Sequence, residues 1–79
     1  MLELYSAERC PYCVRVRQAL EDKGLAYIHK PVPLGGATSP LKEELIRLGG
    51  KGQVPFLVDP ERKTQMYESG DIIAYIKKL

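Results

Sequence analysis

The sequence has few of the residues that stabilise very small domains through disulfide bonds or a structural metal ion. Its 79 residues include only two cysteines, one histidine and no tryptophan. Two cysteines are too few for a scaffold of several disulfides, and one added histidine does not complete a closed zinc site with four ligands. The chain therefore has to fold around its aliphatic side chains, and a hydrophobic content of 44% suits one ordinary globular domain over residues 1–79.

Long apolar runs and long charged runs are absent as well. No stretch approaches the ~20 apolar residues that cross a membrane, and the opening residues MLELY do not resemble a signal peptide. We therefore expect a cytoplasmic protein with no membrane partner, in a compartment that keeps thiols reduced. The formal net charge is only +2, with no basic stripe carrying interleaved aromatic residues, so we do not expect a nucleic-acid partner.

Prolines and glycines divide the first half of the chain. The alternation of apolar residues predicts a strand over residues 2–5. Pro11 suits the first turn of a helix, which should run to about Lys23 and stop at Gly24. A second strand is predicted over residues 25–29, which are rich in β-formers at their centre.

The second half contains a further helix, a hairpin and a last helix. Ser39 is expected to cap a helix that begins at Pro40 and ends at the glycines 49 and 50. Strands over residues 55–58 and 64–67 should form a hairpin, and Ser69 is expected to cap the last helix. The residues expected on the inner face of the middle helix are Leu41, Leu45 and Leu48.

These elements follow one another in the order β-α-β-α-β-β-α. The first βαβ unit should be parallel and right-handed, and the later hairpin is antiparallel. The predicted fold is therefore an α/β domain with a four-stranded mixed sheet and helices packed on it. This is the thioredoxin-like fold in its minimal form.

The two cysteines lie in the sequence CPYC, between the first strand and the first helix. A crosslink, half of a metal site and a reactive dithiol are the three explanations to weigh. Cys10 falls at the helix N-cap, where free N–H groups and a partial positive charge favour a thiolate, and Arg9 is expected to add to this effect. Cys13 falls one turn inside. A zinc site using His29 and an inert reduced pair remain open, but the position between a strand and a helix favours redox chemistry, with Cys10 as nucleophile and Cys13 as resolving thiol.

The residues Cys10-Pro11-Tyr12-Cys13 resemble the active-site sequence of the dithiol glutaredoxins, and the resemblance extends over essentially the whole chain. It implies a glutathione-dependent thiol–disulfide oxidoreductase that reduces protein disulfides and glutathionylated thiols. Glutathione would be a co-substrate, no cofactor or metal would be bound, and the protein would be a monomer. The resemblance also implies that the ring of Tyr12 lines the glutathione groove.

Two further motifs extend this resemblance. Pro55 matches the cis-proline before the third strand of thioredoxin-like proteins, which would leave the Val54 backbone free to pair with glutathione. A plain proline at the start of a strand is the alternative. Glu68-Ser69 is similar to a motif of glutathione transferase N-terminal domains and of glutaredoxin 2-like proteins, in which the serine and the helix start hold the γ-glutamyl carboxylate. A simple helix cap is the alternative there.

The sequence also departs from the usual glutaredoxin pattern. Ala7 stands where many members have a basic residue, and Gln53 stands where a threonine precedes Val-Pro. Two other functions remain open. One is an iron–sulfur carrier that holds a cluster between two chains through the first cysteine and glutathione. The other is a thioredoxin-like reductant that a flavin reductase recharges.

Overall fold

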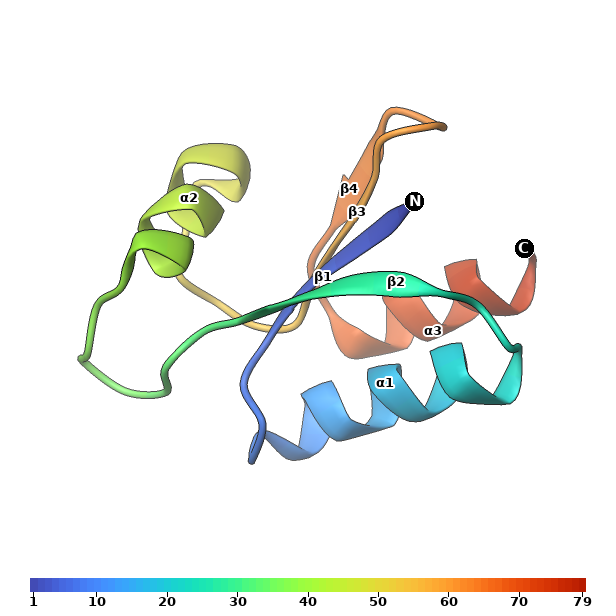
Figure 1. The fold of residues 1–79 in the computed structure, drawn as a ribbon, viewed down its shortest axis with the longest axis horizontal. Helices are drawn as coiled ribbons and strands as arrows, with labels where there is room; N and C mark the ends of the chain where they lie inside the picture. Colours follow the sequence, from blue (N-terminus) through green and yellow to red (C-terminus); the bar gives the residue numbers. More distant parts are fainter.

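The computed structural model describes all of residues 1–79, and its elements follow the predicted order (Figure 1). The sheet order is β2-β1-β3-β4, with β2 parallel to β1 and with β3 and β4 antiparallel to their neighbours. This is the expected four-stranded mixed sheet. The strands are β1 (Leu2–Ser6), β2 (Tyr27–Pro31), β3 (Phe56–Asp59) and β4 (Thr64–Met66), and the helices are α1 (Pro11–Asp22), α2 (Pro40–Gly49) and α3 (Ser69–Lys77).

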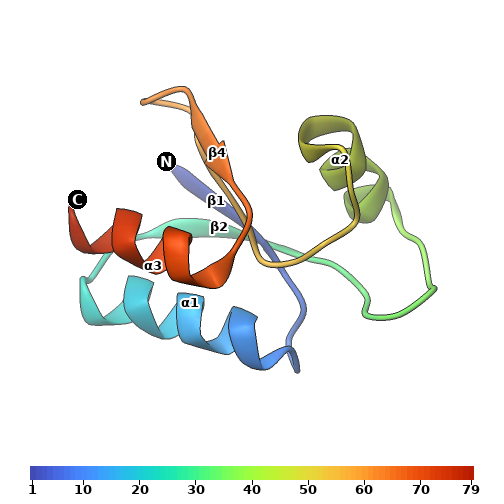
Figure 2. The same cartoon turned by 180° about the vertical axis from the view of Figure 1, so that it is seen from behind.

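The helices lie on two sides of the sheet. Helices α1 and α3 run side by side on one face, whereas α2 stands apart on the other side (Figures 1 and 2). Neighbouring residues of a strand pack on the two faces of the sheet alternately, because successive side chains of a strand point to opposite faces. Leu4 is buried in the cluster with α1 and α3, and Tyr5 is buried in the cluster with α2. None of the three helices is long and apolar enough to span a membrane.

Helix α1 buries one stripe of side chains against the sheet. Cys13, Val16 and Leu20 are its buried residues, and their spacing of three and four puts them on one face. Burying an aliphatic side chain of this size contributes about 1.5–3 kcal/mol. The helix ends just before Gly24, whose φ of +66° is a backbone conformation that glycine adopts without strain. The predicted helix is confirmed, with Cys13 on its inner face.

Strand β2 begins two residues later than predicted. After α1, the amide of Leu25 donates to the carbonyl of Leu20 at 3.0 Å, and the Leu25 side chain packs on the core beneath the helix end. Leu25 therefore closes the helix instead of opening the strand. The strand continues to Pro31, which is tolerated because β2 is an edge of the sheet and needs no further donor there.

Helix α2 is capped as predicted but turned differently. The Ser39 hydroxyl accepts from the Lys42 amide at 3.1 Å, and the helix ends at Gly50 with a φ of +93°. Leu45 is buried, but 45% of Leu48 is exposed, so the expectation that Leu48 faces inward is wrong. The ring of Tyr67 occupies the space beside the last turn, next to Gly49, and its hydroxyl donates to the Lys51 carbonyl at 2.6 Å.

A polar cluster ties α2 to the sheet edge. The Lys30 ammonium of β2 lies 2.9 Å from carboxylate oxygens of both Glu3 and Glu44. The Tyr5 hydroxyl also donates to Glu44. Because these groups neutralise one another, the half-buried lysine can sit between β1, β2 and α2.

The last three elements are displaced by about one residue from the prediction. Strand β3 begins at Phe56 instead of Pro55, and β4 ends at Met66 instead of Tyr67. Glu68, with a φ of +71°, is the N-cap of α3, and its carbonyl accepts from the Ile72 amide at 3.0 Å. Ser69 is therefore the first helical residue, and the expectation that it caps α3 is wrong.

Candidate active site at the start of helix α1

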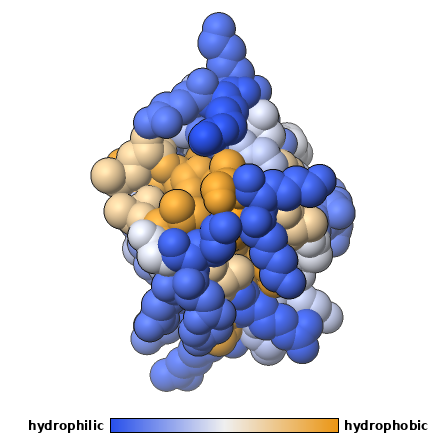
Figure 3. Space-filling view, turned by 90° about the vertical axis from the view of Figure 1, so that its right-hand side faces the viewer, coloured by the Kyte–Doolittle hydropathy of each residue, from blue (hydrophilic) through white to orange (hydrophobic).

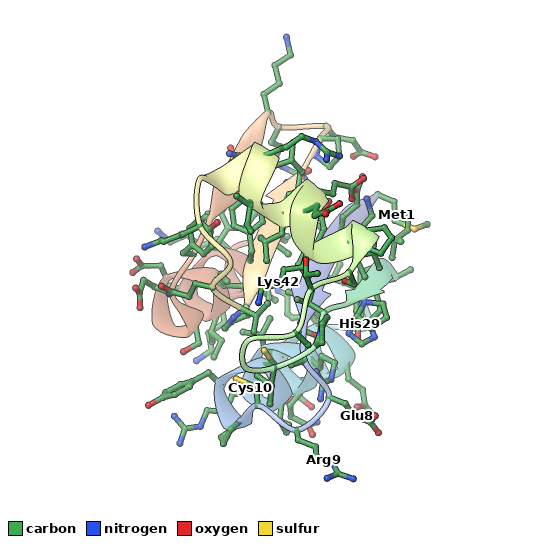
Figure 4. All side chains as sticks on the ribbon, turned by 90° about the vertical axis from the view of Figure 1, so that its left-hand side faces the viewer. Met1, Glu8, Arg9, Cys10, His29 and Lys42 are labelled. Atoms are coloured by element: carbon green, nitrogen blue, oxygen red, sulfur yellow. The ribbon has the colours of Figure 1, made fainter.

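Cys10 is the N-cap residue of α1, as predicted. Its φ and ψ are −74° and 120°, and its carbonyl accepts from the Val14 amide at 3.0 Å. The residue is half-buried, and its sulfur stands at the end of α1 where free N–H groups and the helix dipole favour negative charge. Arg9 is exposed and points away from Cys10 (Figure 4), so the expected support from Arg9 does not rest on a direct contact.

Cys13 lies one turn further along and is completely buried. Its sulfur accepts a hydrogen bond from the Ala7 amide at 3.4 Å. Burial raises the pKa of Cys13 to about 11, and the Ala7 hydrogen bond opposes that rise. The two cysteines therefore differ strongly in their access to water, and both are free thiols.

Arg17 is a residue of this region that the sequence reasoning missed. Its guanidinium donates to the Ser6 hydroxyl and to the carbonyls of Ala7 and Glu8. The signal that could have found it is its spacing of four residues from Cys13, which places both on one side of α1. The same cluster includes His29 of β2, whose ring is hydrogen-bonded to the Ser6 hydroxyl.

No group of three or more His, Cys, Asp or Glu side chains is placed to bind a metal ion. His29 is exposed on β2 and is paired with Ser6. It does not join the two cysteines in a common ligand set.

A hollow of about 350 Å³ lies beside the cysteine turn. It draws on three separate segments: the first turn of α1, the loop before β3 and the start of α3. All five residues expected to bind glutathione line it, and Gln53 is the sixth lining residue. The five are Tyr12, Val54, Pro55, Glu68 and Ser69.

The loop before β3 has the geometry expected from the sequence. The Val54–Pro55 peptide bond is cis, and Pro55 is buried. No backbone hydrogen bond within the chain uses the N–H or the carbonyl of Val54. These two groups are thus available on the wall of the hollow.

The start of α3 forms the opposite wall. Glu68 is exposed, and its carboxylate accepts from the Gln53 side-chain amide at 3.4 Å, across the hollow. The first N–H groups of α3 have no partners inside the helix, which is a property of every helix start. This wall therefore combines a carboxylate, a hydroxyl and unpaired donors.

A larger groove, of about 500 Å³, lies between α1 and α3. It contains neither cysteine, and most of its lining is charged or polar at the rim. Size alone does not identify the reactive site here, because Tyr12 of the cysteine turn and the unpaired backbone groups of Val54 line the smaller hollow.

Together these features define a class: a thioredoxin-like domain with a dithiol at the start of its first helix and a polar hollow beside it. The model of the family "Glutathione S-transferase, N-terminal domain" matches residues 4–79. The chain belongs to this family, and it is also related to the glutaredoxins.

Two curated relatives illustrate that relationship. The chain is similar to glutaredoxin 3 of Escherichia coli (strain K12), with 37% identity over 54 residues, which is 68% of this chain and 61% of that protein. It is similar to glutaredoxin 2 of the same strain, with 33% identity over 78 residues, which is 99% of this chain and 34% of that protein. The chain thus spans about a third of the length of glutaredoxin 2.

A solved structure gives the same result in three dimensions. The chain resembles glutaredoxin 2 from Salmonella typhimurium, a protein solved in complex with glutathione, with a TM-score of 0.76 and 25% sequence identity. The match covers 96% of this chain and 32% of that one. The expected thioredoxin-like fold is confirmed.

Proposed function

We propose that this protein is a glutathione-dependent thiol–disulfide oxidoreductase that reduces protein disulfides and glutathionylated thiols through Cys10 and Cys13. The observation that carries the proposal is the juxtaposition of a half-buried N-cap cysteine with the hollow formed by the Val54–Pro55 loop and the start of α3. The similarity to glutaredoxins over most of the chain supports it.

The reaction begins at Cys10. Its thiolate attacks one sulfur of the substrate disulfide, so that a mixed disulfide forms and the other sulfur leaves as a thiolate that takes up a proton. The Cys13 thiolate then displaces the bound thiol from Cys10 and forms the Cys10–Cys13 disulfide. Two glutathione molecules then reduce the Cys10–Cys13 disulfide and leave as glutathione disulfide, so each cycle moves two electrons from glutathione to the substrate disulfide. When Cys10 carries glutathione, the thiolate of a second glutathione attacks the glutathione sulfur of that mixed disulfide. Glutathione disulfide leaves, and the Cys10 thiolate is regenerated.

The hollow suits the chemistry of glutathione. The free N–H and carbonyl of Val54 would pair with the backbone of its cysteine residue, as strands pair in a sheet. The Ser69 hydroxyl and the first N–H groups of α3 would bind the γ-glutamyl carboxylate, because an anion is stabilised at a helix N-terminus. The Glu68 carboxylate would accept from the ammonium group next to that carboxylate, and the Tyr12 ring would cover the remaining side.

The proposal also covers the oligomeric state, the cofactor requirement and the cellular compartment of the protein. The protein acts as a monomer without a bound cofactor, and it works in the reducing environment of the cytoplasm. Its substrates are proteins that carry a disulfide or a glutathionylated cysteine.

The first experiment is turnover of the mixed disulfide of glutathione and hydroxyethanethiol with two electron sources. One reaction receives glutathione with glutathione reductase, and the other receives thioredoxin reductase. We expect turnover with glutathione. Turnover with thioredoxin reductase alone would retain the dithiol and overturn the glutathione site, and no turnover in either reaction would overturn the whole proposal.

A further inference from the structure

We propose that Arg17 is a positioning residue that keeps the buried Cys13 able to resolve mixed disulfides, by holding the loop between β1 and α1 around the Cys13 sulfur. The consequence for catalysis rests on the proposed function. The contacts of Arg17 and the ionisation of Cys13 do not, and they can be measured separately.

The guanidinium of Arg17 holds three consecutive residues, the last residue of β1 and the first two of this loop. Its Nη1 donates to the Ser6 hydroxyl at 2.9 Å and to the Ala7 carbonyl at 3.2 Å. Its Nη2 donates to the Glu8 carbonyl at 2.8 Å. A planar guanidinium with several fixed donors suits such a task better than a single ammonium group. The side chain thus ties the second turn of α1 to the segment that precedes Cys10.

The fastened loop is the one that contacts Cys13. The Ala7 amide points at the Cys13 sulfur from 3.4 Å, and the Ala7 carbonyl of the same residue is held by Arg17. The Ala7 carbonyl also accepts from the Cys10 amide at 3.3 Å. One residue of the loop therefore connects both cysteines with the arginine.

Ser6 anchors this arrangement from the sheet side. It is completely buried, and its hydroxyl bonds both to Arg17 and to His29 of β2. Because the Ser6 hydroxyl has partners on two elements, the loop is fixed between α1 and the edge strand. An arginine that only added charge to the surface would direct its guanidinium into solvent, whereas that of Arg17 is used in hydrogen bonds within the chain.

The electrostatics agree with the geometry. Cys13 must ionise to attack the mixed disulfide, and its burial makes this costly. Burial is the main cause of its raised pKa, while the Ala7 amide and the positive charge of Arg17 act in the opposite direction. The charged or titratable groups that act on this thiol are Cys10, which raises the pKa of Cys13, and Arg17.

The step that Arg17 assists is the second half of the protein-disulfide reaction. The Cys13 thiol gives up a proton, which balances the one that the departing substrate thiolate takes up, and the Cys13 thiolate attacks the Cys10 sulfur of the mixed disulfide. The Cys10–Cys13 bond forms, the bond from Cys10 to the substrate breaks, and the departing substrate thiolate is protonated. Removal of glutathione from Cys10 by a second glutathione does not use Cys13 and therefore does not need Arg17.

The test compares Arg17→Met and Arg17→Lys with Arg47→Met, a matched control for an exposed arginine of α2 that makes no hydrogen bond or ion pair in the structure. We expect Arg17→Met to slow protein-disulfide reduction about tenfold, since it removes charge-assisted hydrogen bonds, with deglutathionylation changed less than about twofold. Arg17→Lys should fall between, and Arg47→Met should match the parent. Equal losses in both reactions for both Arg17 variants would overturn the proposal, because a general loss of structure predicts them.

A second readout does not depend on turnover. In Cys10→Ser protein with isotope-labelled cysteine, carbon NMR of the Cys13 Cβ follows the ionisation of this thiol with pH. We expect the midpoint to move upward when Arg17→Met or Arg17→Lys is added, more for methionine, and to stay in place for Arg47→Met. An unchanged midpoint in both Arg17 variants would overturn the proposal even if the protein proves active with glutathione. A shifted midpoint in a protein that does not use glutathione would overturn the proposed function and leave the role of Arg17 intact.

Discussion

At the scale of single residues, the two cysteines are separated by their access to solvent. Cys10 is half-buried at the end of α1, and Cys13 is completely buried beneath it. Only a thiol that a substrate can reach is able to start the exchange, and only a second thiol held close by can finish it without glutathione.

Serine substitutions separate these two roles. Cys10→Ser should abolish both protein-disulfide reduction and deglutathionylation, because no other thiol is accessible. Cys13→Ser should retain deglutathionylation and lose most protein-disulfide reduction. Both are measured as initial rates with glutathione and glutathione reductase. Residual turnover of Cys10→Ser would show that the assignment of the nucleophile is wrong.

Two serines that each lie at the start of a helix should behave differently. Ser69 lines the hollow and is not the cap of α3, so Ser69→Ala should raise the KM for glutathione about tenfold with little change in stability. Ser39 caps α2 through its hydroxyl, so Ser39→Ala should cost about 1 kcal/mol in the free energy of unfolding without changing this KM. Steady-state kinetics and urea denaturation distinguish them. A KM unchanged by Ser69→Ala would remove Ser69 from the proposed binding site.

The residues that a sequence can reveal are those whose meaning is local. CPYC is contiguous, so its place at a helix start follows from the strand before it and the proline within it. Arg17 could not be assigned in this way, since its three acceptors lie nine to eleven residues earlier and face it only after the loop has folded. The direction of Arg9 likewise depends on the loop and not on its neighbour in the sequence.

At the scale of elements, α2 is held at its end by a close approach of backbone and ring. A Cβ added at Gly49 would fall onto the Tyr67 hydroxyl and within 2.7 Å of its Cζ atom. We expect Gly49→Ala to lower the free energy of unfolding by about 1–3 kcal/mol, the usual cost of overpacking. Gly36→Ala is the matched control, because nothing lies within 4 Å of the added atom. Urea denaturation of both variants checks this, and equal stability would contradict the close contact.

The hairpin and α3 share one buried carboxylate. Asp59 is 2% exposed, accepts from the Tyr75 hydroxyl at 2.6 Å, and lies 3.1 Å from the Arg62 guanidinium. The hydrogen bond from Tyr75, followed by the contacts of Arg62, lowers the pKa of Asp59. A carboxyl whose pKa is lower in the folded state adds stability above its unfolded pKa of about 3.9, and this stability is lost as the pH falls through the folded value.

The expected consequence is acid sensitivity that depends on Asp59. The free energy of unfolding should fall below about pH 4 in the parent protein and less steeply in Asp59→Asn. Glu61→Gln is the control, since Glu61 is exposed and paired only with the chain N-terminus. Denaturation by urea at several pH values gives both slopes. Parallel slopes for the parent and Asp59→Asn would contradict this assignment.

The order and type of the elements could be predicted, because prolines, caps and glycines act within a few residues. Their exact limits could not. Leu25 lies in a stretch rich in strand-forming residues but closes α1. Leu48 fits the inner face of an ideal helix but is exposed, and the ring of Tyr67, from another part of the chain, lies beside the neighbouring Gly49. Ser69 has the right chemistry for a cap, yet the positive φ of Glu68 moves the helix start by one residue.

At the scale of the whole molecule, the cysteine turn and the C-terminal ends of α1 and α3 lie at opposite ends. Figure 3 views the end where α1 and α3 finish, and it shows apolar surface at the centre framed by hydrophilic side chains. Leu25 and Leu79, which follow these two helices, are half-buried against the main core cluster. The cysteine turn lies at the other end of α1, as Figures 1 and 4 show.

The iron–sulfur alternative makes a prediction at this scale. A cluster held by the first cysteine and glutathione needs two chains, whereas the proposed enzyme works as one chain of 8.9 kDa. Protein purified without oxygen in the presence of glutathione should be colourless and should sediment as a monomer. A brown dimer with visible absorbance would favour the cluster carrier instead.

The two edge strands of the sheet also affect whether the protein associates with other chains at high concentration. Its two outer strands are poor templates for a further strand: β2 is broken off by Pro31 and carries an ion-paired lysine, and β4 has only three residues. The unpaired backbone groups of an exposed strand edge can pair with another chain, and short or proline-ended edges suppress that pairing. The consequence is a domain whose sheet edges resist pairing with the unfolded segments of other polypeptides.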